Sequence, residues 1–216
     1  MRVVLIAAKQ LAFAKTRLGP ALGSVVERAA LAEAMFRDVL SAALGSRIAE
    51  QVAVVSSDPA LLTLAGKAGA LTIDEEFPRG LNVAVRLATR ELVRRGALTV
   101  CTVLSDIPLV TGEDIDAAFA AMPQGESGVV LVPSRDFSGT NMIVRMPADV
   151  VVTRFGRLSL VRHLDDCRKR AIECAVVRMQ RPALDLDVPA DLIEFARVSS
   201  MTHTQSHLAR LGLFHG

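Results

Sequence analysis

The sequence predicts an α/β fold in which helices cover a mostly parallel β-sheet. Short apolar runs, typical of strands buried on both faces, alternate with longer segments whose apolar residues recur at helical spacing. Hydrophobic residues make up 51% of the 216 residues, which is enough for one sizeable core. This alternation of strands and helices is typical of an α/β sandwich.

The first part of the chain supplies most of the alternation. Strands are expected at residues 3–8, 52–56, 70–73, 98–104 and 129–132. The segments between them place small and apolar residues on one helical face, and helices are expected at residues 24–44, 59–68 and 80–95. Asp58-Pro59 marks the start of the second helix, because proline is favoured in a first turn.

The pattern changes beyond residue 133. A strand is expected at about 140–145, a helix at 158–170, a strand at 172–178 and a last helix at 189–198. We interpret these elements as a second half of one domain, residues 1–198, that closes over the open edge of the sheet. Residues 199–216 are polar and then weakly amphipathic, and are interpreted as a C-terminal tail that packs on the body or on a neighbouring subunit.

Composition restricts the partners. The 25 basic and 23 acidic residues nearly balance, so no field is strong enough to favour nucleic acid as a partner. No apolar run approaches the length of a membrane span. The three cysteines are an odd number without C-x-x-C spacing, which favours reduced thiols and a cytoplasmic location.

Three cations follow the first strand. Lys9, Lys15 and Arg17 lie within nine residues in a loop that leaves a strand end, where open α/β sheets bind ligands. A guanidinium fork and two ammonium groups suit a triphosphate. The loop lacks the glycine-rich P-loop pattern, and the alternative interpretation is a solvated basic loop.

Carboxylates stand in two places. Asp106 directly follows the strand at 98–104, where a carboxylate is well placed to hold Mg²⁺ against substrate phosphates. The alternative for Asp106 is a turn or helix-capping aspartate. Asp185 and Asp187 lie two residues apart and share one side if the chain is extended. Asp187 alternatively caps the last helix, with Pro189 in its first turn.

Two helix starts could bind ligands. Gly80 and Asn82 open the helix at 80–95, where Asn82 either contacts a base or ribose or is only a cap. Gly156 and Ser159 open the helix at 158–170, where free N–H groups and the helix dipole favour an anion. His163 lies one turn beyond Ser159 on the same side, but a lone helical histidine is more often packed than catalytic.

Together these segments resemble the family of 2-phospho-L-lactate guanylyltransferases, also described as phosphoenolpyruvate guanylyltransferases, of coenzyme F-420 biosynthesis. The matching segments are AAKQLAFAKTRL (7–18), GLNVAV (80–85), LSDIPLV (104–110), GTN (139–141), FGRLSLVRH (155–163) and LDLDVPADL (184–192). They spread over nearly the whole chain up to about residue 195. The AKTRL and FGxxS…H segments are quite specific, whereas SDIPL and the DxD segment are shared with nucleotidyltransferases at large.

The resemblance implies a Rossmann-like, GT-A-like nucleotidyltransferase fold, a three-layer sandwich around a mostly parallel mixed sheet. It implies an enzyme that transfers GMP from GTP to the phosphate of a small phosphorylated three-carbon acid and releases pyrophosphate. Mg²⁺ is then expected as the cofactor, held by Asp106, Asp185 and Asp187. A homodimer is an open possibility.

Further roles follow from the same resemblance. Lys15 and Arg17 are expected to bind the GTP phosphates and, with Asp106, to act in catalysis. Gly80 and Asn82 are expected near the nucleoside. From its place in the cation loop rather than from the resemblance, Lys9 is also expected to bind the nucleotide phosphates. The residues expected to bind the phospho-acid are Thr140, Gly156 and Ser159.

One departure concerns the acceptor. The family usually carries an acidic residue before Gly-Thr-Asn, where this chain has Ser138. Members differ in using 2-phospho-L-lactate, phosphoenolpyruvate or 3-phospho-D-glycerate. Two alternatives stay open: a molybdopterin- or sugar-phosphate nucleotidyltransferase, which usually has a glycine-rich loop after its first strand, and a catalytically silent nucleotide-binding regulator.

Overall fold

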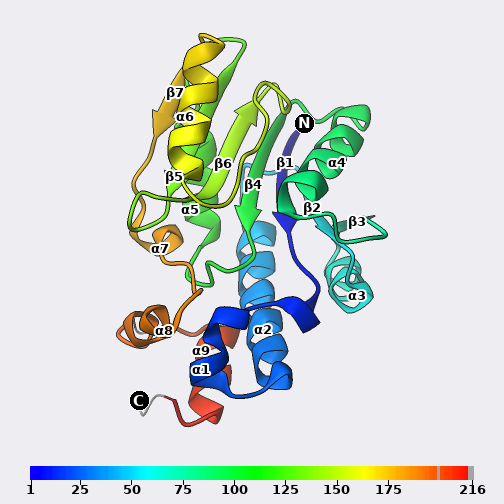
Figure 1. The fold of residues 1–216 in the computed structure, drawn as a ribbon. Coiled ribbons are helices and arrows are strands. Elements are labelled where there is room, and N and C mark those ends of the chain that lie inside the picture. Colours follow the sequence, from blue (N-terminus) through cyan, green and yellow to red (C-terminus); the bar gives the residue numbers. More distant parts are fainter. Residues whose placement is uncertain (199, 214–216) are drawn as a thin grey trace.

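The computed structural model describes residues 1–198 and 200–213 (Figure 1). A seven-stranded sheet has the order β3-β2-β1-β4-β6-β5-β7. Its strands are β1 (Arg2–Ala7), β2 (Gln51–Ser56), β3 (Leu71–Asp74), β4 (Thr99–Leu104), β5 (Gly128–Pro133), β6 (Thr140–Met146) and β7 (Cys174–Val176). Only β6 runs antiparallel to its neighbours, β4 and β5. The mostly parallel mixed sheet is confirmed.

Helices cover both faces of the sheet, as predicted for three layers (Figure 1). They are α2 (Val25–Leu44), α3 (Pro59–Lys67) and α5 (Gly112–Ala120) on one face, and α4 (Leu81–Arg94) and α6 (Ser159–Lys169) on the other. Alternating side chains of β1 divide between the layers: Val4 and Ile6 pack toward α2, Val3 and Leu5 toward α4. None of the described helices has the length and apolar content needed to cross a membrane.

Local signals explain where the helices begin. Ser24 starts α2 through a capping box with Glu27, and the Asp58 side chain accepts from the first N–H groups of α3. Thr111 and Asp114 form a second capping box at α5. That helix was not predicted, although its sequence carries this pattern.

Besides the two hydrophobic cores on the faces of the sheet, a third core lies beyond the sheet, where short helices pack against α2. Its short helices are η1 (Leu11–Phe13), η2 (Thr16–Leu18), α1 (Gly19–Leu22), α8 (Pro189–Phe195) and α9 (His203–Arg210). The remaining short helix, α7 (Gln180–Ala183), contacts β5 and β6. Helix α9 packs on α2 (Figure 1), where buried Asp38 accepts from the N–H groups of His203 and Thr204 at 2.7 and 2.9 Å. Within the predicted tail, α9 therefore packs on the body, while residues 199 and 214–216 lie outside the described residues.

One expectation about the second half is wrong. Strand β6 does not close over a sheet edge but lies inside the sheet, between β4 and β5. Its backbone pairs on both sides, so the polar groups of β4 and β5 that face it are satisfied by a ladder. The second half thus extends the sheet as far as β7.

Strand directions bring distant loops together. Parallel β1 and β4 end at the same edge of the sheet, and antiparallel β6 begins there. The loop after Ala7, the loop after Leu104 and the start of β6 at Thr140 therefore meet at one edge. This is where open α/β sheets bind ligands.

Candidate active site

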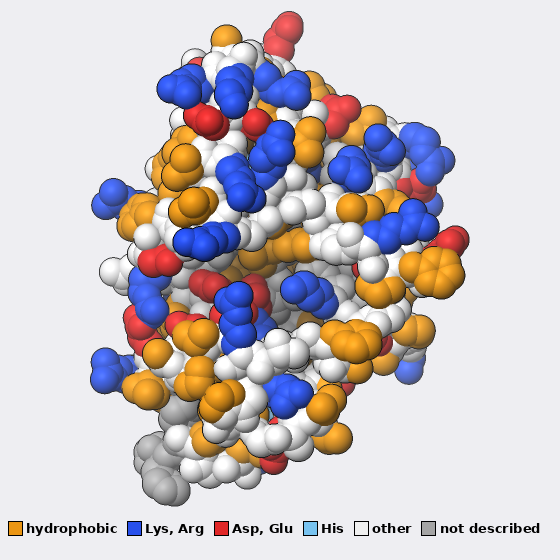
Figure 2. Space-filling view, viewed as in Figure 1, with side chains coloured by type: hydrophobic (Ala, Val, Ile, Leu, Met, Phe, Trp, Pro, Cys, Tyr) orange, Lys and Arg blue, Asp and Glu red, His pale blue; other side chains and the backbone are white. Residues whose placement is uncertain are grey.

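A cleft of about 840 Å³ lies at this edge. Figure 2 shows it as a hollow across the middle of the molecule, with acidic and basic side chains gathered in it. All predicted site residues except Gly80 and Asn82 line it, namely Lys9, Lys15, Arg17, Asp106, Thr140, Gly156, Ser159, Asp185 and Asp187.

Lys15 links the cation loop to the carboxylates. Its Nζ donates to Asp106 Oδ2 at 2.9 Å and to Asp187 Oδ1 at 2.7 Å, and its side chain is only 8% exposed. Burial disfavours the ammonium, but the two carboxylates outweigh it, so the pKa of Lys15 is raised. The interpretation of this residue as part of a solvated loop is therefore wrong.

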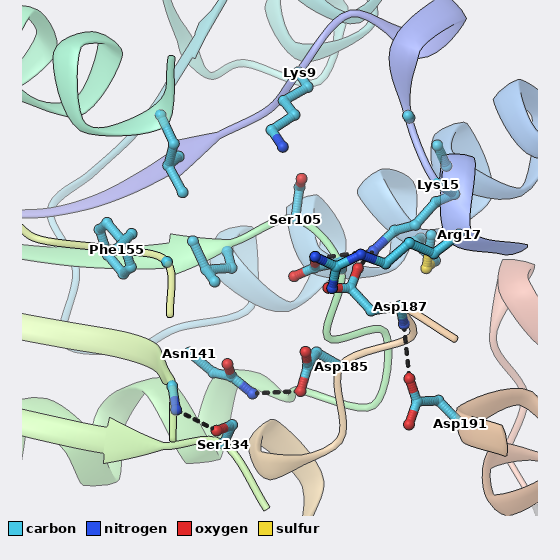
Figure 3. A pocket seen from close by; sticks show the side chains of 18 of the residues that line it. Lys9, Lys15, Arg17, Ser105, Ser134, Asn141, Phe155, Asp185, Asp187 and Asp191 are labelled. Atoms are coloured by element: carbon cyan, nitrogen blue, oxygen red, sulfur yellow. Dashed lines mark hydrogen bonds and ion pairs between the residues drawn. The ribbon is translucent and has the colours of Figure 1, made fainter. Parts of the chain in front are cut away.

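The other two cations are open to ligands. Arg17 Nη1 lies 4.0 Å from Asp187 Oδ2, with 73% of its side chain exposed. Lys9 points into the cleft from the opposite wall (Figure 3). Exposed cations on two sides of a carboxylate cluster suit a polyanion with a bound metal ion: the cations face the anion and the carboxylates face the metal.

The carboxylates come from two segments held side by side. The Leu186 N–H donates to the Asp106 carbonyl at 3.0 Å, which aligns the segment of Asp185 and Asp187 with the loop after β4. The alternative capping roles are wrong, because Thr111 is the N-cap of α5 and Val188 that of α8, although Asp106 does lie in a turn after β4.

The pKa values of Asp185 and Asp187 are shifted in opposite directions. Burial, with the nearby charge of Asp106, raises the pKa of Asp185 to about 6. Burial acts in the same direction on Asp187, but the Lys15 ammonium and Arg17 outweigh it and lower the pKa of Asp187. The cluster thus holds negative charge that one lysine only partly compensates.

The donor set fits Mg²⁺. Across residues 1–198 and 200–213, no three His, Cys, Asp or Glu side chains are already gathered around one metal position. Asp106 and Asp187 nevertheless share one cation, the Lys15 ammonium, and Asp106 Oδ1 is buried without a hydrogen-bond partner among the described residues. Carboxylate oxygens are the ligands that Mg²⁺ prefers.

At the other end of the cleft the predicted acceptor residues, Thr140, Gly156 and Ser159, carry no charge, and we call this part the neutral end, although Arg157 also lines the cleft there. Gly156 has a φ of 112°, a backbone conformation that favours glycine, and Leu158 follows in the left-handed region with a φ of 56°. Ser159 is the first residue of α6, and no side chain caps this helix. The Ser159 N–H donates to the Gly156 carbonyl at 3.0 Å, so only the N–H groups that follow it in the first turn are available to an anion beside Thr140.

His163 is packed behind this end, as expected for a lone helical histidine. The side chain is fully buried; Nδ1 lies 3.1 Å from Thr140 Oγ1, and Nε2 accepts from the Arg154 N–H at 2.8 Å. Burial first, then Arg145 and Arg154, lowers the pKa of His163 to about 4. The imidazole is therefore neutral near pH 7.

The Asn82 side chain does not cap α4, and its expected contact with the nucleoside stays a prediction. Its amide donates to the Phe155 carbonyl at 3.0 Å and accepts from the Phe155 N–H at 2.8 Å. It therefore holds the segment that carries Gly156. Gly80, with a φ of 95°, is the N-cap of α4, and the side chain of its neighbour Leu81 lines the cleft.

Sequence reasoning missed two residues that position the carboxylates. Asn141 donates to the Pro182 carbonyl at 2.9 Å and to Asp185 Oδ1 at 3.3 Å (Figure 3). Asp191 accepts from the N–H groups of Asp187 and Val188 at 2.9 and 2.8 Å. An asparagine in the Gly-Thr-Asn segment and an acid in the first turn of α8 were the available signals.

Ser138 is hydrogen-bonded to an acidic residue, Asp136. The Ser138 hydroxyl and N–H both donate to the carboxylate of Asp136, at 2.7 and 3.0 Å, and the Ser134 hydroxyl donates to it at 2.7 Å. These bonds lower the pKa of Asp136. The loop thus carries a carboxylate although its position before Gly-Thr-Asn is a serine.

Known proteins resemble the chain over almost its whole length. The sequence model of a family described as "Guanylyl transferase CofC like" matches residues 1–214. The phosphoenolpyruvate guanylyltransferase of Sphaerobacter thermophilus is 37% identical over 90% of this chain and 92% of its own. The 3-phospho-D-glycerate guanylyltransferase of Phenylobacterium zucineum is 36% identical over 85% and 84%. The 2-phospho-L-lactate guanylyltransferase of Methanothermobacter thermautotrophicus is 32% identical over 92% and 85%.

Solved structures share the fold. One from Desulfovibrio desulfuricans, described provisionally as a nucleotide-diphospho-sugar transferase, has a TM-score of 0.79 at 20% identity, covering 98% of this chain and 95% of its own. A nucleotidyl transferase from Methanothermobacter has a TM-score of 0.64 at 14% identity, covering 97% and 99%. The Rossmann-like nucleotidyltransferase fold is confirmed.

Proposed function

The chain belongs to the family of CofC-like guanylyl transferases, which are nucleotidyltransferases, and from this premise we propose its reaction. The protein transfers GMP from GTP to the phosphate of a small phosphorylated three-carbon acid and releases pyrophosphate. The pathway that the sequence resemblance implies is coenzyme F-420 biosynthesis.

One observation carries the proposal. A single cleft joins a cation loop, a carboxylate cluster and a neutral anion-binding helix start, with the Lys15 ammonium bonded to both Asp106 and Asp187. Joining two polyanions requires positioning and charge neutralisation more than a covalent nucleophile. The three parts of the cleft supply those functions.

The reaction balances without a covalent enzyme intermediate. An acceptor phosphate oxygen attacks the α-phosphorus of GTP, and a new P–O bond forms. The bond from the α-phosphorus to the oxygen that bridges the α- and β-phosphates breaks, and pyrophosphate leaves with that electron pair. Lys15, Arg17 and Lys9 bind the triphosphate and stabilise charge that develops on the leaving group.

Asp106, Asp185 and Asp187 are the residues that would hold Mg²⁺. The ion would supply charge neutralisation between the two substrates. Because Lys15 already bonds two of these carboxylates, its ammonium exchanges them for the triphosphate when the substrates bind. Thr140, Gly156 and Ser159 bind the acceptor phosphate.

The acceptor is phosphoenolpyruvate or 2-phospho-L-lactate, with 3-phospho-D-glycerate the third candidate. Relatives named for each of these substrates match this chain at similar identity. One hydroxyl or one change of hybridisation is worth only ~1–3 kcal/mol of discrimination. The cleft is therefore expected to reject unphosphorylated acids far more strongly than it separates the three phospho-acids.

Pyrophosphate release tests the proposal. Purified protein is incubated with GTP, Mg²⁺ and each acid in turn, and the products are identified by mass. We expect a GMP conjugate with at least one of the three phospho-acids and none with lactate or glycerate. Conjugates only with a molybdopterin or sugar phosphate, or no pyrophosphate with any acceptor, would contradict it.

A further inference from the structure

We propose that His163 is a positioning residue that turns the Thr140 hydroxyl into a hydrogen-bond donor aimed at the acceptor phosphate. The inference rests on the proposed guanylyl transfer and adds a residue that acts through another. Nothing in the reaction requires His163 to touch a substrate.

The tautomer of His163 follows from its partners. The backbone N–H of Arg154 is only a donor, so Nε2, at 2.8 Å from it, must accept and carries no proton. A neutral imidazole carries one proton, which therefore sits on Nδ1. Nδ1 lies 3.1 Å from Thr140 Oγ1 and donates to it.

The hydrogen bond from His163 Nδ1 determines where the hydroxyl proton of Thr140 can point. Because Thr140 Oγ1 accepts from His163, the hydroxyl proton is left for another acceptor. Among the described residues no other side chain or carbonyl bonds to Thr140 Oγ1. Thr140 is 2% exposed and lines the cleft, so an acceptor in the cleft is the remaining direction for this proton.

His163 joins every segment of the neutral end. Through Nδ1 it contacts the start of β6, and through Nε2 it holds Arg154, two residues before Gly156. It lies one helical turn after Ser159 on α6, on the same side. Its ring also packs edge-on against Phe155, with the centroids 5.7 Å apart. One buried neutral ring therefore orders three phosphate contacts at once.

Two substitutions separate the ring's two bonds. In His163→Asn the shorter amide reaches the place of Nδ1 and keeps a donor for Thr140. In His163→Gln the longer amide reaches the place of Nε2, accepts from Arg154 and leaves Thr140 without its donor. We expect His163→Gln to raise the acceptor KM about tenfold, the worth of one phosphate hydrogen bond, and the GTP KM less than about twofold.

His163→Asn should raise the acceptor KM less than His163→Gln does. The matched control is His203→Gln, the same change at an exposed histidine on α9, which should leave both KM values unchanged. Equal acceptor KM values for the Asn and Gln variants, or an equal rise for GTP, would overturn the inference and leave His163 a packing residue.

A double-mutant cycle tests whether His163 acts through Thr140. Thr140→Val removes the hydroxyl, so adding His163→Gln in that background should raise the acceptor KM no further. Additive effects would overturn the inference. If wild-type protein forms no GMP conjugate, the proposed function fails instead, and the outcome is distinct.

The imidazole can also be observed without turnover. Nitrogen-15 NMR of the ligand-free protein should show His163 protonated on Nδ1 alone from about pH 8 to about pH 5.5. A proton on Nε2 would contradict the inference whatever the activity of the protein.

Discussion

The two ends of the cleft hold their ligand groups in different ways. At the charged end, Lys15 is bonded to Asp106 and Asp187, so the side chains proposed to bind substrate and metal are bonded to one another in the free protein. At the neutral end, Thr140 and the start of α6 are ordered by His163, which binds no ligand itself. In the proposed reaction the charged end exchanges these bonds for bonds to substrate, whereas the neutral end is already organised.

Substitutions at the two ends should therefore affect different substrates and differ in size of effect. Removing a charge at the first end leaves a buried opposite charge without its partner, which is costly. Removing a neutral contact at the second end costs about one hydrogen bond. Four predictions test the contrast.

The largest effect is expected for Asp106→Asn. The substitution keeps the size of the side chain but removes a charge shared with Lys15 and, in the proposal, with Mg²⁺. Turnover should fall roughly a hundredfold or more, as when a major charge-stabilising group is lost. The measurement is kcat at saturating Mg²⁺, with thermal unfolding as the check on folding. Near-normal kcat would contradict the metal assignment.

Lys15→Ala should affect GTP selectively. Its ammonium is the buried member of the cation loop, so the GTP KM should rise about tenfold or more while the acceptor KM changes little. Arg17→Ala, at an exposed side chain of the same loop, should act in the same direction but more weakly. A selective rise in the acceptor KM would assign the loop to the other substrate.

The third prediction concerns stability at the neutral end. The pKa of His163 is lowered from 6.5 to about 4 in the folded protein, so between these values the unfolded chain binds a proton that the folded chain excludes. Stability from this group is full above pH 6.5 and is lost as the pH falls. From about pH 7 to about pH 5.5 the loss should be about 1 kcal/mol.

His163→Asn provides the control for that loss. Asp185, with its pKa raised to about 6, contributes in the opposite direction, so the wild-type slope alone is not diagnostic. The variant keeps Arg145, Arg154 and Asp166 around the site but has no group to titrate. Denaturant unfolding at the two pH values should show the wild type losing more stability than the variant. Parallel losses would contradict a buried neutral His163.

The smallest effect is expected at Ser138. Ser138→Asp introduces a second carboxylate beside Asp136 in the loop before Thr140. Relative rates with the three phospho-acids should shift a few-fold, within the ~1–3 kcal/mol typical of such discrimination, while the GTP KM stays constant. Competition between the acids measures the shift. A change in the GTP KM alone would show that this loop does not contact the acceptor.

Local patterns in the sequence were sufficient for most of the fold. Apolar runs and helical spacing predicted the seven strands and the long helices, because burial on one or both faces imposes those periods. They did not predict that β6 lies between β4 and β5, since chain order does not determine strand order. They also did not predict the short α9, whose N-terminus is held by Asp38, 165 residues away along the chain from His203.

The sequence predicted which residue types form the site better than it predicted which side chains contact one another. Cations and carboxylates after strand ends indicated a polyanion and a metal, but no spacing could predict that Lys15 bonds carboxylates from two other segments. Asn82 does not cap α4 but holds Phe155 by two hydrogen bonds, while its expected place near the nucleoside stays a prediction. Such contacts depend on tertiary packing, which one sequence does not display.

The central claim is that this cleft joins the acceptor's phosphate oxygen to the α-phosphorus of GTP. The direct measurement uses a phospho-acid whose phosphate carries heavy oxygen, with the masses of both products determined and the linkage of the conjugate identified by phosphorus NMR. We expect all of the label to stay in the GMP conjugate, which carries a phosphorus–oxygen–phosphorus linkage, and none to appear in pyrophosphate. Label in pyrophosphate, or a conjugate formed through the carboxylate of the acid, would contradict it.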